Sequence, residues 1–422
     1  MKLGRAAAAA LLLGGPAGGA AAQTAPDGNH LRVYLLTMGT GAQIYERFGH
    51  NAIWIRDTVA KTDLIYNYGM FEFPSGIMGM AGFVGRFAMG RPRYWLGVDS
   101  SIDLELYIYR GAGRNLSAQE LNLLPAQKAD LARRLATNAL PENRYYTYDY
   151  FRDNCSTRVR DMLDAVLGGA LRAATVDQPS GTTYRFHTLR SITNDKLLWL
   201  AIDAGLGPRV DLPIDRWQEM FLPAAVAARV ADLHVRDSSG ALVPLVQSSF
   251  PLLTIDRYHV EAAPPRWVIG FLLIGLAIAL LIVLGVRAGA SGVFGRVVAT
   301  VWMLLMGIGG LLLLFLWWCT AHVATYANHN ALLLTPFALG VVPSLWCRDA
   351  RGGWQWRAIQ LSAVSVLLGV AIAAVPIVSP QANWPIVVLT VPGTLAALWV
   401  AARRERAGAA NLDVATGDGT IG

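Results

Sequence analysis

The sequence is poor in cysteine and in charge. Only 3 of its 422 residues are cysteine, and only 15% are Asp, Glu, Lys or Arg. The 7 histidines are scattered, and no C-x-x-C, H-x-x-H or H-x-x-x-H spacing occurs, so we expect neither a metal site nor a cofactor. The net charge of +7 comes largely from arginines that flank apolar segments, and it does not require a nucleic-acid partner. Internal repeats and low-complexity tracts are absent as well.

Charge is nearly absent from the C-terminal third of the chain. Residues 23–266 have the composition of a soluble domain, whereas residues 267–402 consist of almost continuous apolar segments. Each segment is able to span a membrane as a helix, the third only if it is short or tilted. The segments are residues 267–286, 297–319, 331–346, 358–378 and 384–402. The sequence therefore predicts an all-α bundle of about five transmembrane helices after the soluble domain.

The N-terminus has the pattern of a secretory signal peptide. Lys2 and Arg5 precede an Ala/Leu-rich stretch, and small residues follow as far as Ala22. The apolar core is shorter than the roughly 20 residues that a spanning helix needs. We therefore expect residues 1–22 to be cleaved off rather than retained as an anchor. No cysteine follows the small residues, which excludes a lipoprotein signal.

The distribution of arginine orients the predicted bundle. If the soluble domain is outside, the connections 287–296 and 347–357 face the cytoplasm, and both carry arginines, as does the start of the tail 403–422. The opposite connections, 322–330 and 379–383, contain neither Lys nor Arg. This is the positive-inside pattern. We therefore expect a bacterial inner-membrane protein with a periplasmic N-terminal domain and a cytoplasmic C-terminus.

The soluble domain alternates between strand-like and helix-like patterns. Short runs rich in Val, Ile, Tyr and Leu predict strands at 31–36, 51–55, 63–68 and 104–109. Helical spacing of apolar residues predicts helices over 117–140, 154–167 and 224–233. A capping box of Ser117 and Glu120 opens the first of these helices, and 175–183 is expected to be a loop. The pattern favours an α+β domain, with an antiparallel sheet packed by helices.

Cys155 is the one cysteine expected in the exported domain. Cys319 and Cys347 lie near the ends of predicted transmembrane helices on opposite sides of the membrane, so they cannot easily bridge each other. An unpaired thiol in an oxidising compartment suggests a function, and a buried, inert cysteine is the alternative. Cys155 also opens a predicted helix, where the helix dipole lowers the pKa of a thiol and free N–H groups can form part of an oxyanion hole. The position favours a nucleophile.

A thiol nucleophile needs a base, and His50 has the most suggestive setting. It follows Gly49 at the entrance of a predicted strand, although a lone histidine is more often a solvated or core residue. His187 stays a weaker candidate. A histidine on a strand beside a cysteine that opens a helix is the papain-type arrangement.

The third member of such a site orients the imidazole. A hairpin between the strands 51–55 and 63–68 brings Asn67 near His50, and Asp57 and Tyr66 are weaker candidates. Other polar or aromatic residues bracket the thiol, and they either supply oxyanion donors, grip an anionic head group or simply pack the domain. They are Tyr148, Tyr150, Arg152, Asn154 and Arg158.

Taken in order, several segments resemble those of a known family, the Lnb-type N-terminal periplasmic domain. The resemblance spans about residues 31–255 and, less specifically, the multispanning tail. No single segment is specific, whereas the ordered set is. The segments are Phe48-Gly49-His50, Tyr66-Asn67-Tyr68-Gly69, residues 143–151 running into Asp153-Asn154-Cys155-Ser156-Thr157-Arg158, and Met220-Phe221-Leu222-Pro223.

The resemblance carries expectations about fold and activity. The family is similar to permuted NlpC/P60 enzymes, papain-like thiol enzymes in which the His strand precedes the Cys helix. Its members with an assigned activity are lipoprotein N-acyltransferases. The resemblance thus implies that Cys155 is the nucleophile and acyl-thioester carrier, with His50 as its general base. It also implies a phospholipid acyl donor and the N-terminal amine of a diacylated lipoprotein as acceptor, in ping-pong order.

Other functions stay open at this point. The same dyad would serve a hydrolase, either a phospholipase or thioesterase or a peptidoglycan amidase, although five spanning helices suit a lipid substrate better. A non-catalytic envelope receptor or assembly factor with an inert thiol is the third possibility. The loop 322–330 brings His322 and His329 to the outer face, where they form an ordinary polar loop or orient lipid head groups.

Overall fold

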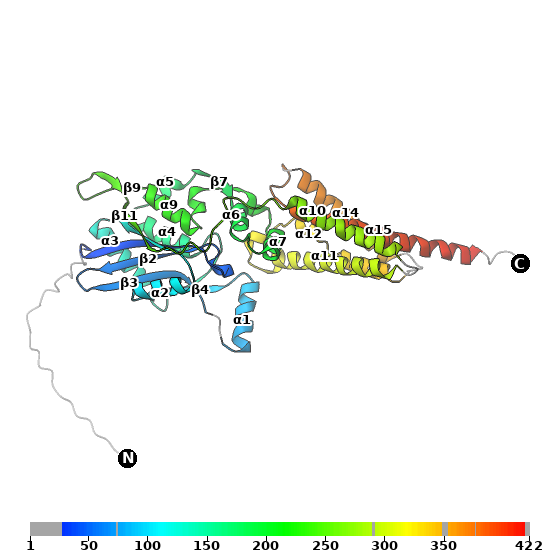
Figure 1. The fold of residues 1–422 in the computed structure, drawn as a ribbon, viewed down its shortest axis with the longest axis horizontal. Helices are drawn as coiled ribbons and strands as arrows, with labels where there is room; N and C mark the ends of the chain where they lie inside the picture. The colour runs from blue at the N-terminus through cyan, green and yellow to red at the C-terminus, as the bar shows by residue number, and fades with distance from the viewer. Residues whose placement is uncertain (1–27, 73–74, 289–291, 348–352, 376, 418–422) are drawn as a thin grey trace, which may run out of the picture.

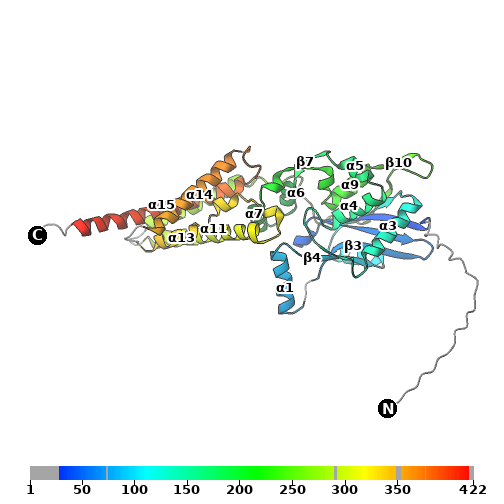
Figure 2. The same cartoon turned by 180° about the vertical axis from the view of Figure 1, so that it is seen from behind.

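The computed structural model describes residues 28–72, 75–288, 292–347, 353–375 and 377–417. The chain forms an α+β domain at one end and a long helical bundle at the other (Figure 1). The opposite view shows the same end-to-end arrangement (Figure 2). The predicted signal peptide, residues 1–22, lies outside the described residues.

A seven-stranded antiparallel sheet forms the centre of the α+β domain, in the order β11-β5-β1-β2-β3-β4-β6. Its strands are β1 (Leu31–Met38), β2 (His50–Asp57), β3 (Thr62–Met70), β4 (Arg93–Asp99), β5 (Leu116–Leu121), β6 (Tyr145–Thr147) and β11 (Val246–Leu253). In the β2–β3 hairpin, Ile53 pairs with Tyr66 and Trp54 with Ile65. The strands predicted at 31–36, 51–55 and 63–68 are therefore confirmed.

Helices pack on both faces of the sheet. They are α3 (Pro125–Asn138), α4 (Cys155–Val166) and α9 (Pro223–Asp232) on one face and α2 (Ile102–Gly111) on the other. Side chains alternate along a strand, so Leu35 and Ile53 enter the core under α4, while Leu36 and Trp54 enter the core on the α2 side. The helices predicted at 154–167 and 224–233 match α4 and α9.

Three predictions about local structure were wrong, wholly or in part. The run 104–109 belongs to helix α2, which Ser101 caps by accepting a hydrogen bond from the Asp103 N–H. The helix expected over 117–140 begins only at Pro125, because the preceding residues form strand β5 between β1 and β11. Pairing with two neighbouring strands outweighs a local capping pattern. The expected loop 175–183 also contains a short strand, β7 (Pro179–Thr183).

A largely helical segment leads from the sheet to the membrane. It comprises α5 (Ala170–Thr175), α6 (Tyr184–Ser191), α7 (Lys196–Gly205) and α8 (Arg216–Glu219), with β7 paired to β8 (Pro213–Asp215) and β9 (His234–Arg236) paired to β10 (Leu242–Pro244). Arg185 holds this segment together, because its buried guanidinium donates to the carboxylates of Asp203 and Asp211. A charge buried this deeply needs such partners. Helix α1 (Ile77–Ala88) projects sideways from the domain (Figure 1).

Four helices among the described residues are long and apolar enough to cross a membrane. They are α10 (Val268–Arg287), α11 (Val293–Cys319), α14 (Trp354–Ala374) and α15 (Trp384–Gly417). The apolar part of α15 ends at Arg406. The tail expected from residue 403 onward therefore begins inside this helix.

The helix expected at 331–346 is broken into short pieces. They are α12 (Asn330–Leu333), α13 (Ala338–Val341) and a 3-10 helix at Val342–Leu345. Pro336 and Pro343 interrupt the segment, because proline lacks the N–H that a continuous helix needs. The segment packs closely on α11, where a side chain at Gly310 would collide with the carbonyl oxygen of Leu334.

Buried amides connect the bundle to the α+β domain. The side chains of Asn328 and Asn330 both donate to the carbonyl of Ala204 at the end of α7, at 2.8 and 2.9 Å. Gln381 donates to the carbonyl of Leu206 at 3.1 Å, and Asn383 donates to Asn330 at 2.8 Å. The connections 322–330 and 379–383 therefore both lie at the domain end of the bundle. We call this set of contacts the amide junction.

Candidate active site

Cys155 is the first residue of α4, and Asn154 caps that helix. The Asn154 Oδ1 accepts a hydrogen bond from the Thr157 N–H at 2.9 Å, and the Thr157 hydroxyl accepts one from the Asn154 N–H at 2.8 Å. The Asn154 Nδ2 donates to the carbonyls of Tyr150 and Phe221, each at 2.9 Å. Both ends of this side chain are thus used to hold the start of α4. Asn154 positions Cys155, and the N–H groups of the first turn stay directed out of the helix end.

Gly69 makes room for the thiol at the end of β3. Its φ is +88°, and a Cβ at this position would lie 3.3 Å from the Cβ of Cys155. A bulge between Tyr68 and Met70 interrupts the pairing with β4 at the same point. Any other residue here would be strained and would crowd the Cys155 side chain.

His50 begins β2 and faces the thiol. The register of the β2–β3 hairpin, continued to its end, puts His50 opposite Gly69. Because Gly69 lies against the Cys155 Cβ, the imidazole is close enough to the thiol for the charges of the two groups to attract each other. The strand-borne histidine and the helix-opening cysteine, which are 105 positions apart in the sequence, are therefore neighbours in the fold.

Asn67 holds the other side of the imidazole. Its Oδ1 lies 3.1 Å from the His50 Nε2, and its Nδ2 donates to Asp99 at 3.0 Å and to Glu105 at 2.7 Å. Because carboxylate oxygens accept hydrogen bonds, the two acids fix which end of the Asn67 amide faces His50. The imidazole must then carry its proton on Nε2 and donate it to Asn67. This leaves Nδ1 as the nitrogen that can take a proton from Cys155.

Electrostatics favours the thiolate. Burial alone would raise the pKa of the Cys155 thiol, but the positive charge of His50, a hydrogen bond to His50 and further hydrogen bonds to Asn51 and Ser156 lower that pKa to about 7. Burial works in the other direction on His50, where the neighbouring thiolate and Asn67 outweigh it and raise the imidazole pKa. Each group stabilises the charged form of the other. The pair therefore holds a reactive thiolate near neutral pH.

Tyrosines surround the thiol. The hydroxyl of Tyr146 is buried beside Gly69 and Cys155, and it has no hydrogen-bond partner among the described residues. Tyr148 stacks on Tyr94 with ring centroids 4.3 Å apart and meets Tyr150 edge-on at 6.0 Å. Burial raises the pKa of the Tyr148 hydroxyl, and the nearby thiol raises it further, so this group stays protonated and able to donate. The predicted site residues Tyr148 and Tyr150 thus belong to an aromatic cluster beside the thiol.

Arg158 is paired within the domain. Its guanidinium donates to Asp153 at 2.7 Å and lies over the ring of Tyr146 at 4.1 Å. The charge that was predicted to grip an anionic head group is therefore already balanced by a carboxylate. Arg158 stiffens the turn before Cys155 and supports the Tyr146 ring.

The two loop histidines have different positions. His322 stacks on Tyr150 with ring centroids 6.1 Å apart, and its Nε2 bonds to the carbonyl of Phe87. The rings of His322, Tyr150 and Tyr148 thus form a continuous path from the end of α11 to the surroundings of Cys155. His329 lies in the amide junction instead, where its backbone N–H donates to Gln381 at 2.9 Å.

His187, the weaker candidate for the base, has partners of its own. It is buried, and its Nε2 lies 2.8 Å from the Thr182 hydroxyl and 3.3 Å from the Glu219 carboxylate. Its Nδ1 accepts a hydrogen bond from Arg190. These contacts give His187 a structural setting among α6, β7 and α8.

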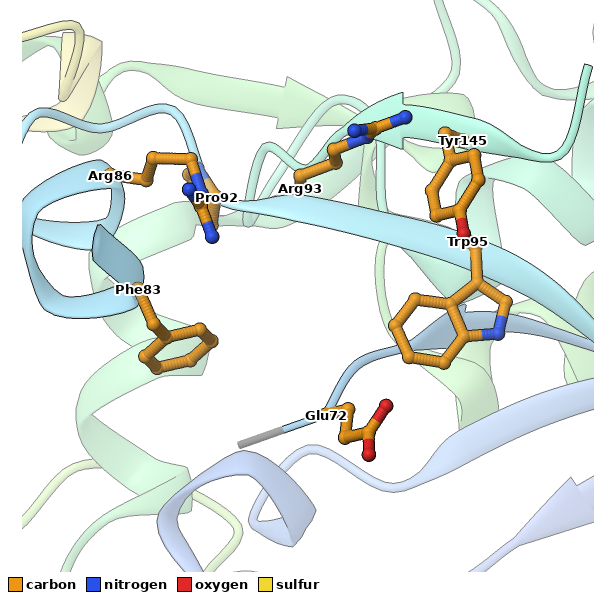
Figure 3. Close-up of a pocket in the computed structure, with 7 residues that line it drawn as sticks. All are labelled: Glu72, Phe83, Arg86, Pro92, Arg93, Trp95 and Tyr145. Atoms are coloured by element: carbon orange, nitrogen blue, oxygen red, sulfur yellow. The ribbon is translucent and has the colours of Figure 1, made fainter. Parts of the chain in front are cut away.

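A cavity of about 210 Å³ lies between α1 and the sheet edge (Figure 3). It is lined by Glu72, Phe83, Arg86, Pro92, Arg93, Trp95 and Tyr145. Neither Cys155 nor His50 lines it, and the β4 residues that do face away from the core under α4. Among the described residues, no cluster of three or more His, Cys, Asp or Glu side chains is suited to hold a metal ion.

Sequence reasoning missed Glu105 and Asp99. Glu105 sits in the run 104–109, which was predicted as a strand, and only the helix α2 aims its carboxylate at Asn67. One signal was available: a single acid in an otherwise apolar run is costly to bury unless it has a partner. Tyr146 was part of the recognised Tyr-rich segment, but its position beside the thiol was not predicted.

The fold and site together define a membrane protein whose exported α+β domain carries a Cys–His–Asn arrangement of the thiol-enzyme type. Residues 20–195 match the Lnb N-terminal periplasmic domain, and residues 261–405 match the Lnb transmembrane domain. The chain belongs to the Lnb family, and it is an inner-membrane protein with a periplasmic N-terminal domain. No curated protein and no solved structure matches it significantly.

Proposed function

We propose that this protein is a thiol-dependent N-acyltransferase that moves an acyl chain from a phospholipid to the N-terminal amine of a lipoprotein. The observation that carries the proposal is the row of Asn67, His50 and Cys155, in which Asn67 is hydrogen-bonded to the imidazole and the imidazole lies beside the thiol at a helix start. Family membership supports the acceptor, because Lnb-type proteins with an assigned activity are lipoprotein N-acyltransferases. The permuted NlpC/P60 fold expected from the resemblance fits the order of the His strand and the Cys helix along the chain.

The first half-reaction loads the enzyme. The Cys155 thiolate attacks the carbonyl carbon of a phospholipid ester, and the C–O bond to the glycerol oxygen breaks. The His50 imidazolium gives its proton to the leaving lysophospholipid alkoxide, which departs as an alcohol. The acyl chain stays on Cys155 as a thioester.

The second half-reaction transfers the chain. The lipoprotein amine attacks the thioester carbonyl, and His50 takes a proton from the attacking nitrogen. The C–S bond then breaks, an amide remains on the lipoprotein, and Cys155 leaves as a thiolate beside a protonated His50. The two half-reactions restore the starting state in ping-pong order.

Both tetrahedral intermediates carry a negative oxygen that needs donors. The backbone N–H of Cys155 lies at the start of α4, where the helix dipole favours negative charge. The Tyr146 hydroxyl, buried and without a partner among the described residues, is the best placed side-chain donor. We assign these two groups to the oxyanion, with Tyr148 as a further donor.

The arrangement of the bundle supports a lipid donor. The ring path from Tyr148 through Tyr150 to His322 connects the thiol with the end of α11, so that the site faces the membrane side of the domain. We place the C-terminus in the cytoplasm, because the arginine-free connections 322–330 and 379–383 lie at the domain end of the bundle. The outer leaflet then supplies phospholipid at the level of the site.

Two measurements test the proposal. The purified protein, incubated with phospholipid vesicles, should gain one acyl mass on the Cys155 peptide, and hydroxylamine should remove it. Expression in a host deficient in lipoprotein N-acylation should add one acyl chain to the intact mass of a lipoprotein, and Cys155→Ser should abolish this gain. A thioester that forms and yields only free fatty acid would instead identify a hydrolase. Full complementation by Cys155→Ser, with no adduct on the native protein, would leave a non-catalytic envelope role.

A further inference from the structure

Helix α1 exposes an apolar surface that the protein itself does not cover. None of its residues is buried, and Ile77 and Met78 are 88% and 87% exposed. Val84 and Phe87 are exposed as well. The exposed fractions of Ile77 and Met78 exceed that of Ile269 (73%) on the transmembrane helix α10, whose exposed residues face lipid. A water-soluble surface rarely carries such a patch without a partner.

The position of α1 fixes its level relative to the membrane. Its C-terminal end is held by the connection that follows α11, because the Ala321 N–H donates to the Met89 carbonyl at 2.9 Å and His322 bonds to the Phe87 carbonyl at 2.9 Å. Trp318, in the last turn of α11, marks the outer interface, where tryptophan is enriched. Helix α1 therefore leaves the protein at the level of the outer lipid head groups.

The direction of α1 fits the membrane plane. It runs across the long axis of the bundle and projects sideways from the molecule, as both views show (Figures 1 and 2). Its 12 residues reach about 18 Å outward at the usual rise per residue. A helix in this direction lies along a bilayer surface rather than through it.

The charges around α1 fit the same setting. The helix contains no acidic residue, and its one charged residue is Arg86 in the last turn. Arg86 lines the cavity beneath the helix together with Arg93, Trp95 and one acidic residue, Glu72 (Figure 3). Arg93 also lies over the Tyr145 ring at 4.0 Å. Arginine and tryptophan beside an apolar helix are the composition of an interfacial segment in contact with lipid phosphates.

We propose that α1 is an interfacial helix whose apolar residues insert into the outer leaflet of the membrane beside the active site. The occupant of this surface is the lipid bilayer. The His322–Tyr150–Tyr148 ring path starts at the end of α1, so the inserted helix flanks the side from which a lipid ester reaches Cys155. This last consequence rests on the proposed acyl transfer, whereas the insertion itself does not.

Fluorescence quenching tests the insertion without any assay of activity. We would label Met78→Cys in a Cys155→Ala/Cys319→Ser/Cys347→Ser background and reconstitute the full chain in phosphatidylethanolamine/phosphatidylglycerol vesicles. Val59→Cys, in the β2–β3 turn and 79% exposed, is the matched control. Lipids that carry a nitroxide on the acyl chain should remove most of the Met78 signal and leave the Val59 signal unchanged. Iodide in the water should do the reverse.

Two results would overturn the proposal. Equal quenching of both labels by iodide, with none by nitroxide lipid, would place α1 in water. A Met78 signal that changes only on addition of a lipopeptide would assign the surface to a protein partner.

A second variant connects insertion to catalysis. Met78→Glu should lose transfer from vesicle phospholipid while its Cys155 keeps the native rate of alkylation by iodoacetamide, and Val59→Glu should keep both. Native transfer in Met78→Glu, despite lipid quenching at position 78, would show that α1 inserts without serving the reaction. Failure of acyl transfer in the native protein would leave the quenching result unaffected, so the two proposals are separable.

Discussion

The Glu105 carboxylate accepts a hydrogen bond from the Asn67 amide at 2.7 Å, and this contact determines which end of the Asn67 amide faces His50. The Asn67 amide nitrogen also donates to Asp99, so its oxygen is left for the imidazole. Contacts therefore run from Glu105 to Asn67, from Asn67 to His50 and from His50 to Cys155. Glu105 adds one residue to the row of thiol, imidazole and amide. Glu105 acts through Asn67, and it is a positioning residue.

Removal of the Glu105 acceptor should weaken catalysis without removing the base. In Glu105→Leu, Asn67 loses a buried partner worth about 1–3 kcal/mol, and its amide is free to rotate away from His50. We expect acyl transfer to fall about tenfold to a hundredfold and the pH profile of Cys155 alkylation to shift upward. Glu105→Gln retains an acceptor oxygen and should restore most of both. An unchanged pH profile in Glu105→Leu, with activity lost, would reduce Glu105 to a purely structural role.

Asn67 should contribute less to the rate than His50. Asn67→Ala leaves an imidazole that can still accept a proton, whereas His50→Ala removes the base, a loss that usually costs about 10²–10⁴-fold. Asn67→Asp should be worse than Asn67→Ala, because it adds a third carboxyl group beside Asp99 and Glu105. Single-turnover rates of thioester formation should be measured for the three variants. Equal losses of rate in Asn67→Ala and His50→Ala would mean that Asn67 does more than orient the imidazole ring.

The reactivity of Cys155 should rise through a midpoint near neutral pH. Its thiol pKa is lowered to about 7, and only the thiolate reacts with iodoacetamide. The labelling rate should therefore increase as the pH rises through about 7 and level off above it. In His50→Ala the attraction that lowers this pKa is lost, so burial should move the midpoint above that of an ordinary cysteine. Mass analysis of the Cys155 peptide, in a Cys319→Ser/Cys347→Ser background, measures the labelling rate at each pH. The same midpoint with His50 and with His50→Ala would contradict the interaction between His50 and Cys155.

Gly69→Ala should impair the nucleophile more than it impairs folding. The φ of +88° and the 3.3 Å approach to the Cys155 Cβ predict strain of about 1–3 kcal/mol together with displacement of the thiol. Gly181→Ala provides the control, because Gly181 has a similar φ of +76° but no atom within 4 Å of the added Cβ. Both variants should lower the melting temperature, and only Gly69→Ala should slow the alkylation of Cys155. Equal alkylation rates would show that the site tolerates the added methyl group.

Local patterns in the sequence were enough to predict that Asn67, His50 and Cys155 lie together. The strand alternation around His50, the glycine before it and the helix-opening setting of Cys155 are short-range signals, and the β2–β3 hairpin brings Asn67 to the imidazole within 20 residues. The lone acid in the run 104–109 signals that Glu105 needs a partner, but that partner depends on how α2 crosses the far face of the sheet. The contact of Asp99 depends on the pairing of β4 with β3. The packing of α2 is a tertiary relationship with no local signature.

In the membrane region, too, local patterns predict the helices but not how they pack. Hydropathy alone predicts α10, α11, α14 and α15, since a spanning helix needs little more than about 20 apolar residues. The break at Pro336 and Pro343 was visible in the sequence, but its tolerance depends on the glycines of α11 that admit the bent backbone. Helix α1 was not predicted at all. The exposed apolar surface of α1 can be interpreted only from the fold, which places this helix beside the end of α11.

The amide junction should hold the domain on the bundle, and Asn330→Ala tests this. Asn330 is fully buried, donates to the Ala204 carbonyl and accepts from Asn383. Its truncation removes the acceptor of the buried Asn383 amide, at a cost of about 1–3 kcal/mol, and leaves Asn328 as the side-chain donor to the Ala204 carbonyl. We expect faster hydrogen exchange at the end of α7 and in the connection 322–330, and a lower melting temperature. Asn143→Ala, which removes an exposed amide bonded to the Thr137 carbonyl, should change neither. His322 lies in the same connection, so a looser connection should also disturb its stacking on Tyr150 and lower acyl transfer from vesicle lipid.

Equal hydrogen exchange and equal melting temperatures in Asn330→Ala and Asn143→Ala would mean that the amide junction does not hold the α+β domain on the bundle.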